Sequence, residues 1–365
     1  MGANASVGVS GTRHHAPWPW YAGGVRGIAS VALFALALCA GCRSDDGAVP
    51  VESRSAPGKP TPVQAPKHSS GGAVVAAGPH LYWIAGTTGS PSNLARRFNT
   101  KTKVWESLPS AGVSRLQAAG ASVGPLVLVA GGMRRVTKHS DAIEAYDTVA
   151  HTWTTTASLP DPLAKVAMVA VGETAFVFGG VKVLNASLAS YDSESVRTAV
   201  ALTDGGTKLE VLPSMPTARE SAAAVAVRGK VWVLGGRVTV GGSDEAISNR
   251  TDVVEIYDPT AKTWTDGPAL PRAASGYGVH VAGTVVVFGE DLLNPLRPMV
   301  LDVASGVWTV GEERDRKVVG GVVDGAVVIE GAIYVLSTVV HGLSEPSEPH
   351  VCTYDPAKDA WTVVD

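Results

Sequence analysis

The strongest constraint on the fold is a pattern that returns along the chain about every fifty residues. Between Val231 and Trp264 an apolar run ends in two glycines, a polar loop follows, and a second apolar run ends in Tyr257, seven residues before the tryptophan. The same order recurs at 127–153 and at 333–361. Such a period predicts stacked copies of one supersecondary unit, each too small to bury its apolar face alone.

Six copies can be placed between residues 71 and 365. Their expected innermost strands are short apolar runs that end at a glycine or a turn signal: Leu81–Ala85, Leu126–Ala130, Ala175–Phe178, Val231–Leu234, Val285–Phe288 and Ala332–Leu336. The spacing of seven between an aromatic residue and a tryptophan occurs at Phe98/Trp105, Tyr146/Trp153, Tyr257/Trp264 and Tyr354/Trp361. Leu301 replaces the aromatic residue before Trp308. In the third copy an insertion, residues 193–208, follows Tyr191, and Leu209 stands in the tryptophan position.

The combination of double glycine, Tyr-Asp, Trp and a following Leu-Pro resembles the kelch-repeat family over nearly all of residues 71–365. The resemblance implies an all-β fold, a six-bladed kelch-type β-propeller with four-stranded blades. Glycine at the strand ends permits close backbone approach, and the large aromatic residues fill the space between neighbouring sheets. We therefore interpret the repeated aromatic residues as core residues rather than as platforms for sugar stacking.

The two ends of the repeat region suggest how the ring closes. Only residues 362–365 follow Trp361, which is too short for a further strand, and residues 72–77 precede the first expected innermost strand. We expect the N-terminal strand, residues 72–77, to be the outer strand of the last blade. That pairing would leave no open strand edge at the seam.

The segment before the repeats predicts export. Residues 1–26 contain Arg13 and Arg26 but no acid, and 27–39 is an uncharged apolar run that suits a signal peptide better than a membrane span. The run ends in Leu-Cys-Ala-Gly-Cys, which resembles a bacterial lipobox with Cys42 as the lipidated residue. A plain secretory signal or an uncleaved anchor is the alternative.

Three regions follow from this interpretation: a lipoprotein-type signal peptide over 1–42, a flexible Pro/Ser/Gly-rich tether over 43–70, and the propeller over 71–365. The expected location is the cell envelope, with a lipid anchor in the outer membrane or at the cell surface. Removing residues 1–42 would leave 28 basic and 33 acidic residues. This balance gives no support for binding to nucleic acid.

Cysteine and histidine usage predicts neither a disulfide nor a metal site. With Cys39 removed and Cys42 lipidated, only Cys352 remains. The six propeller histidines show no metal-ligand spacing, and no cofactor motif is present.

Basic residues recur just before the strands expected to be fourth in their blades: Arg115, Lys165, Arg219, Arg272 and Arg316. An inward ring of guanidinium groups would favour an anionic ligand through bidentate hydrogen bonds, which makes Arg115, Arg219 and Arg272 candidate ligand-binding residues. The alternative is that they brace loops by bonding carbonyl groups and nearby acids. Glu290 replaces a glycine near the expected channel mouth, where it is a weak candidate for acid or base catalysis or a member of a surface ion pair.

Two classes of function remain. The leading one is a non-catalytic binding or scaffold module, anchored to the envelope, whose long polar loops at 237–252 and 337–350 meet a protein or glycan partner. The alternative is an enzyme similar to sugar mutarotases or epimerases, acting on an acidic sugar at the axial mouth. Phosphate-binding loops and hydrolase motifs are absent from the sequence.

Overall fold

The computed structural model describes the residues 58–65, 70–87, 89–186, 191–240, 247–289, 297–312, 322–339 and 348–364. All described residues belong to one compact unit, Cys42–Asp365.

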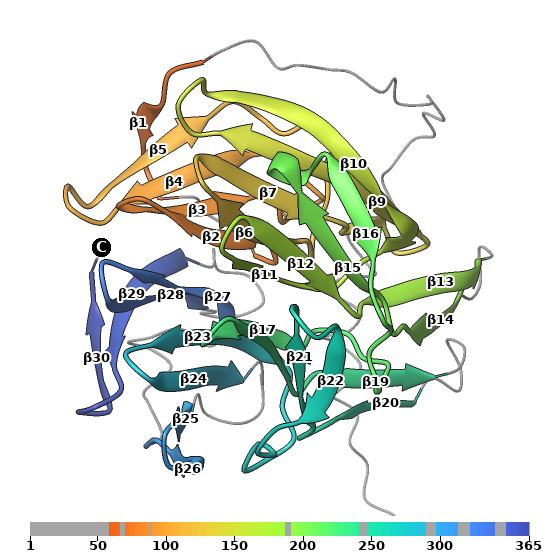
Figure 1. Ribbon diagram of the computed structural model, residues 1–365. Helices are drawn as coiled ribbons and strands as arrows, with labels where there is room; N and C mark the ends of the chain where they lie inside the picture. Colours follow the sequence, from red (N-terminus) through yellow and green to blue (C-terminus); the bar gives the residue numbers. More distant parts are fainter. Residues whose placement is uncertain are drawn as a thin grey trace, which may run out of the picture. The chain divides into compact units, whose positions relative to one another are not determined.

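Six antiparallel sheets form the blades of a propeller, as the repeats predict (Figure 1). Blade 1 contains β2 (Ala73–Ala77), β3 (His80–Ile84), β4 (Ala95–Asn99) and β5 (Val104–Leu108). Blade 2 contains β6 (Ala119–Val123), β7 (Leu126–Ala130), β9 (Lys138–Asp147) and β10 (Thr152–Leu163). Blade 3 contains β11 (Ala167–Val171), β12 (Thr174–Phe178), β15 (Ala199–Thr203) and β16 (Lys208–Val211), with a 3-10 turn at Asp204–Gly206.

The remaining blades repeat this order. Blade 4 contains β17 (Ala223–Val227), β18 (Lys230–Leu234), β21 (Val254–Asp258) and β22 (Thr263–Asp266). Blade 5 contains β23 (Gly276–Val281), β24 (Thr284–Gly289), β25 (Met299–Asp302) and β26 (Val307–Val310). Blade 6 contains β27 (Val322–Ile329), β28 (Ala332–Val339), β29 (Glu348–Asp355) and β30 (Ala360–Val363).

The spacing of seven is the register of the hairpin between the third and fourth strands. Tyr146 lies directly opposite Trp153, and Tyr257 directly opposite Trp264. Their ring centroids are 5.2 and 5.0 Å apart. Trp153 also donates from Nε1 to the Pro109 carbonyl of blade 1, at 2.7 Å. The aromatic residues therefore fill the space between blades, which confirms their interpretation as core residues.

The third blade keeps this register with different residues. Leu202 in β15 pairs with Leu209 in β16, so leucine occupies both the aromatic and the tryptophan position. Tyr191, after which the insertion was expected, is not the equivalent of Tyr146 and Tyr257, because it begins β14 (Tyr191–Ser195), which pairs with β13 (Val181–Ala186). The hairpin of β13 and β14 lies between the second and third strands, and residues 193–208 include the third strand β15, so the expected insertion at 193–208 is wrong.

The innermost strands are β2, β6, β11, β17, β23 and β27, each in contact with the next around the ring. The strands that end in glycine, expected to be innermost, are second in their blades. A two-residue hairpin turn, such as Gly78-Pro79, joins each first strand to its second strand. This turn pairs the glycine-ending strand with the strand before it in the chain, which therefore takes the innermost place. Gly78 has φ of 55° and Arg228, in the equivalent turn of blade 4, has φ of 51°. Left-handed turn residues match the twist of the paired strands.

The expected closure of the ring by the N-terminal strand is therefore wrong. The strand β2 pairs with β3 in blade 1, and blade 6 takes all four strands from the C-terminal part of the chain. The seam between these blades is closed by packing: Val74 and Ala76 lie in one apolar cluster with Val327 and Ile329. Gly71 adds a hydrogen bond from its backbone N–H to Oδ1 of Asp324, at 2.9 Å.

Part of the expected tether belongs to the fold. The strand β1 (Thr61–Val63) pairs antiparallel with β5 at the outer edge of blade 1. Pro62 is tolerated there because an edge strand uses hydrogen bonds on one side only. Ala65 packs against the same apolar cluster as Val364. The segment 58–65 thus covers the outer edge of the first blade.

Candidate functional site

Two of the candidate arginines are internal braces of their blades. Arg115 and Arg219 are both 0% exposed. Arg219 donates from Nη1 to the carbonyl oxygens of Gly235 and Val253, at 3.1 and 2.8 Å, and from Nη2 to Oε2 of Glu255. A ligand cannot reach either guanidinium group. The contacts of both arginines are those of the alternative interpretation, in which the arginines bond carbonyl groups and nearby acids.

Arg115 makes the equivalent contacts in blade 2, to the carbonyls of Gly131 and Ala142 and to Glu144. Burial lowers the pKa of both guanidinium groups, and the carboxylate beside each opposes that shift. The signal that sequence reasoning missed is a glutamate two residues before the repeated tyrosine. It occurs as Glu144 and Glu255, in the same two blades that carry the buried arginines.

The other predicted site residues do not join them. Arg272 is half-buried and donates from Nη2 to the Arg297 carbonyl at 3.1 Å. Met299 pairs with Val287 in blade 5, as Glu255 pairs with Val233 in blade 4, so Arg272 has no equivalent glutamate. Cys42, Glu290 and Arg316 lie outside the described residues. No two of the candidate ligand-binding arginines share a site.

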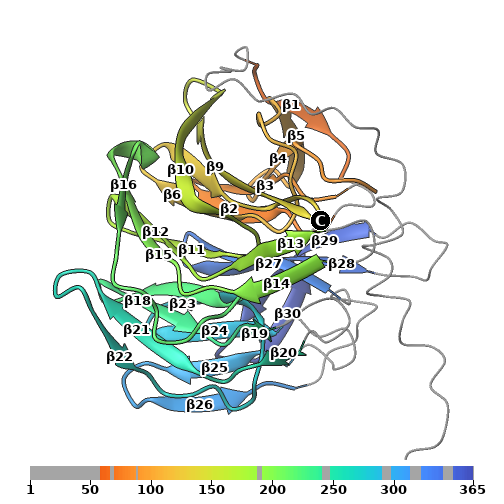
Figure 2. The ribbon, with the colours of Figure 1, turned by 90° about the vertical axis from the view of Figure 1, so that its right-hand side faces the viewer.

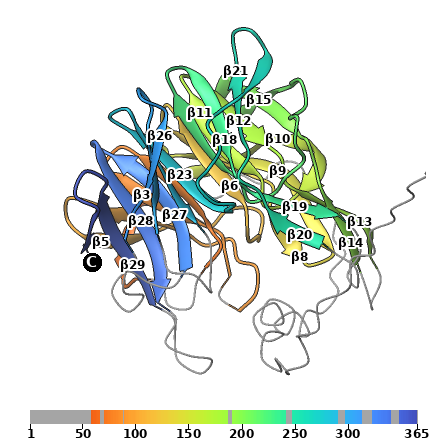
Figure 3. The ribbon, with the colours of Figure 1, turned by 90° about the horizontal axis from the view of Figure 1, so that it is seen from below.

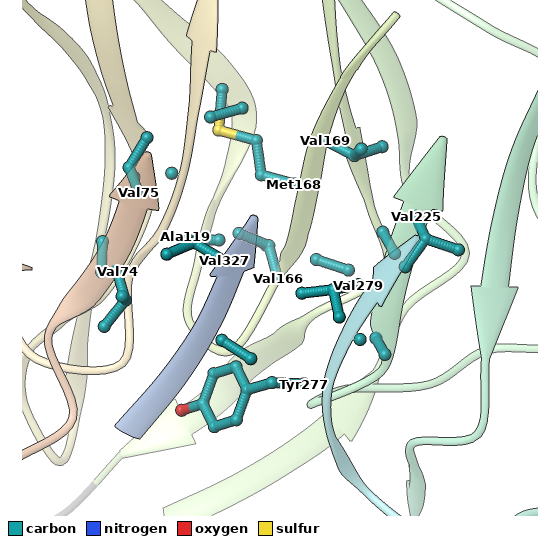
Figure 4. A pocket seen from close by; sticks show the side chains of 18 of the residues that line it. Val74, Val75, Ala119, Val166, Met168, Val169, Val225, Tyr277, Val279 and Val327 are labelled. Atoms are coloured by element: carbon teal, nitrogen blue, oxygen red, sulfur yellow. The ribbon is translucent and has the colours of Figure 1, made fainter. Parts of the chain in front are cut away.

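The six innermost strands enclose an axial cavity of about 450 Å³ (Figure 4). Its wall contains mostly Ala, Val and Gly, and Figure 4 shows Tyr277, Val166 and Val279 among the lining side chains. Small residues are required where the inner strands approach each other. A Cβ atom on Gly120 would lie 2.5 Å from Val75, and one on Gly278 would lie 3.0 Å from Ala223.

A chain of backbone hydrogen bonds runs around one mouth of this cavity. Gln117 donates to the Gly71 carbonyl at 2.6 Å, Lys165 to Gln117 at 2.9 Å, Ser221 to Lys165 at 2.9 Å, and Gly276 to Ser221 at 3.1 Å. Gln117, Lys165 and Ser221 have φ of 56°, 56° and 51°, a left-handed conformation that costs a non-glycine residue about 1 kcal/mol. This rim links five successive blades and places three polar side chains at the opening.

Among the predicted basic residues that the structure describes, Lys165 is the one at this rim, and its charge is already paired. Its Nζ lies 3.2 and 3.1 Å from the two carboxylate oxygens of Glu220, whose side chain is 3% exposed. Thr239 donates from Oγ1 to the same carboxylate at 3.0 Å. His139 lies close enough to Lys165 and Glu220 for their charges to act on it. Its Nδ1 is 3.1 Å from the Val181 carbonyl oxygen, and burial lowers the pKa of its imidazole.

Three hairpins project on the side of the propeller that carries this mouth. They are β8 (Met133–Arg135) with the start of β9, β13 with β14, and β19 (Arg237–Val240) with β20 (Ile247–Arg250). All three gather on one side in Figure 3, and β14 contacts β19. Figure 2 shows β13 and β14 beside β19 and β20. Ser195 joins these two strands, since its Oγ accepts from Thr239 N at 2.9 Å and donates to the Arg237 carbonyl at 3.2 Å. Leu184 and Val240 are 48% and 64% exposed.

The described residues contain no group of three or more His, Cys, Asp or Glu that could hold a metal ion. Cys352 is buried. Within the same ranges, no helix has the length and apolar character needed to cross a membrane.

Comparison with known proteins agrees with the fold. Residues 71–286 match the model of the KLHDC2/KLHL20/DRC7 Kelch-repeats domain. Human "Kelch repeat and BTB domain-containing protein 12" is 25% identical over 228 residues, which cover 57% of this chain and 36% of that protein. Human "Kelch-like protein 34" is 25% identical over 60% of this chain and 34% of its own length. "Kelch-like protein terF" of Aspergillus terreus is 27% identical over 52% of this chain and 43% of its own length.

The alignments thus span about a third to two fifths of the length of these relatives. The family model itself covers more than half of this chain. On the evidence of its six four-stranded blades and this match, the chain belongs to the kelch-repeat family.

Proposed function

We propose that this chain is a binding module that presents its projecting hairpins to a partner protein, while a lipid anchor holds it at the cell envelope. The observation that carries the proposal is the ordered set of hairpins from blades 2, 3 and 4. Ser195 fixes β14 to β19, so this surface is organised before a partner arrives. Preorganisation reduces the entropy lost on binding.

The exposed side chains favour a protein over a glycan. Among the described residues, the large apolar side chains that are exposed are all Val or Leu, including Leu184 and Val240 at the hairpins. A glycan partner would be recognised better by exposed aromatic rings, which stack on sugars, whereas the repeated aromatic residues here are core. Exposed aliphatic side chains on rigid strands are suited to the apolar centre of a protein interface.

The mutarotase-like alternative receives no support from the described residues. An acidic sugar at the axial mouth would need Arg219 and its neighbours as counter-charges, and the guanidinium group of Arg219 is buried against Glu255. Lys165 is the basic side chain at the rim, and Glu220 already neutralises it.

Photocrosslinking in cells tests the hairpin surface. A crosslinkable residue at Val240 should capture one defined protein, and Leu184→Asp in the same chain should abolish that capture; a crosslinkable residue at Leu184 should respond in the same way to Val240→Asp. Val149 is the matched control: it is 78% exposed, and it lies in the turn between β9 and β10, at the opposite face. Equal capture at Val149, or capture at either position that survives the Asp substitution of the other, would contradict the proposal.

The anchor is tested separately. Metabolic labelling with a palmitate analogue should mark the wild-type chain and the Cys39→Ala variant but not Cys42→Ala. Labelling that is indifferent to Cys42, or no labelling at all, would remove the anchor from the proposal and leave the hairpin surface untouched.

A further inference from the structure

The axial cavity has the features of a small-molecule site that is independent of the hairpin surface. Its volume of about 450 Å³ falls within the usual range for ligand pockets. Since a water molecule takes about 30 Å³ of liquid, the cavity has room for about fifteen non-hydrogen atoms. This volume is larger than one inserted side chain would fill, so an independent small molecule is a better fit than an anchor residue of a partner protein.

The wall of the cavity offers hydrogen bonds in both directions. Each innermost strand pairs with a neighbour on one side only, so the N–H and C=O groups of its other edge face the axis. An alkyl chain would remove water from these groups without replacing their hydrogen bonds, which is costly. A ligand with several closely spaced donors and acceptors would replace the water.

The charges at the cavity select for a neutral ligand. Lys165 is the one Lys, Arg, Asp or Glu among the described lining residues, and the buried Glu220 carboxylate pairs with it. An additional charge on the ligand would lose its hydration without gaining a counter-ion. Gln117, next to Lys165 on the rim, has a buried Oε1 with no hydrogen-bond partner, and this atom needs a donor such as a hydroxyl group.

Tyr277 adds an aromatic surface. It lines the cavity and is half-buried, and Figure 4 shows its ring beside the opening. An aromatic ring combined with many small hydrogen-bonding groups fits a molecule that has C–H faces and a rim of hydroxyl groups. We propose that the axial cavity binds a neutral polyhydroxylated molecule of the size of a monosaccharide.

The test uses probes of one shape and different charge. Purified protein is titrated with D-glucose, D-galactose and myo-inositol, and with glucuronate and glucosamine, and binding is followed by saturation-transfer NMR up to about 50 mM, a range that detects very weak affinities. We expect at least one neutral probe to bind, and both charged probes to bind more weakly by about tenfold or more.

Variants place the binding in the cavity. Ala224 and Ala326 are half-buried lining residues of blades 4 and 6, so Ala224→Leu and Ala326→Leu each narrow the cavity and should abolish binding; two variants guard against one that fails to fold. Tyr277→Ala should weaken binding by about tenfold and Tyr277→Phe much less, because the ring supplies the contact. Val211→Ala, at a side chain 69% exposed on β16, is the control.

The absence of binding by every neutral probe would overturn the proposal. So would equal binding of glucose and glucuronate, or unchanged binding in both leucine variants when thermal melting shows them to be folded. None of these results bears on the hairpin surface, because the crosslinking experiment there does not depend on the cavity.

Discussion

The buried ion pair of Arg219 and Glu255 allows a quantitative test, because the same fold contains an apolar version of it. In blade 3, Leu163 and Val200 occupy the places held by arginine and glutamate in blades 2 and 4, and both are 0% exposed. Removing one member of a buried pair leaves the other charge without a counter-ion, which costs about 3–5 kcal/mol. Arg219→Leu and Glu255→Val should each lower the free energy of unfolding by this amount.

The double variant should behave differently. Arg219→Leu with Glu255→Val copies the arrangement of blade 3 and leaves no buried charge. We expect it to cost less than the sum of the two single changes. The cost will not be zero, because Arg219 also satisfies the carbonyls of Gly235 and Val253, and Thr217 donates to Glu255 at 2.7 Å. Carbonyl groups that lose a partner in the interior are each worth about 1–3 kcal/mol.

Thermal and urea unfolding of the four proteins measure the coupling between the two residues. For a domain of this size, a loss of about 3–5 kcal/mol lowers the melting temperature by about 6–20 °C. Lys101→Met is the control: its partner is Glu330, at 2.8 Å, but the two side chains are 62% and 61% exposed, so the midpoint should not move. Additive costs in the double variant, or neutral single variants, would refute the view of Arg219 as a charge-balanced brace.

Two further predictions concern the seam and pH. Gly325→Ala should destabilise the fold by about 1–3 kcal/mol in urea unfolding, because the new Cβ would lie 2.3 Å from Cβ of Val74 across the seam. Val74→Ala keeps that Cβ and should not restore stability, whereas Val74→Gly removes the clashing atom, so Gly325→Ala with Val74→Gly should cost less than the two changes do separately. Gly289→Ala, with no atom nearer than 3.8 Å, should be neutral. Burial lowers the pKa of His139; the charge of Lys165 opposes its protonation and that of Glu220 favours it. Because the unfolded chain binds this proton more readily than the folded chain, the free energy of unfolding should fall as the pH drops below about 6.5. His139→Gln should weaken this loss in melting curves recorded from about pH 7.5 to about 5.5. Identical pH profiles of the two proteins would exclude His139 as the source.

The number and type of blades were predictable because the decisive signal is local. The spacing from Tyr146 to Trp153 spans one hairpin, so it records strand register directly. The assignment of strands to blades was not predictable from that signal, since a cyclic pattern reads the same whichever strand begins the repeat. The deciding information lay in the two-residue turns, such as Gly78-Pro79, which pair each first strand with its second.

The candidate site was predicted less well, because burial depends on contacts far apart in the sequence. Arg219 follows a Met-Pro-Thr-Ala stretch that has the composition of a surface loop, and its partner Glu255 lies 36 residues later. Only a comparison of blades 2 and 4 reveals that arginine and glutamate occur together. Lys165, a described basic residue that lines the axial cavity, has a left-handed backbone conformation. Residues other than glycine rarely adopt this conformation, so the sequence does not predict it.

The seam shows how a propeller can close without exchanging a strand between its ends. Strand exchange would protect the edges of the first and last blades, yet here the inner strands β2 and β27 meet through side chains. The apolar cluster at this junction includes Trp83, Phe98 and Trp105, so it is built from the same kinds of residue as the other junctions. Close approach at Gly325 and the hydrogen bond from Gly71 to Asp324 then fix its register. Because β1 covers the outer edge of blade 1, the N-terminal segment protects an open strand edge at the rim of the ring rather than at its seam.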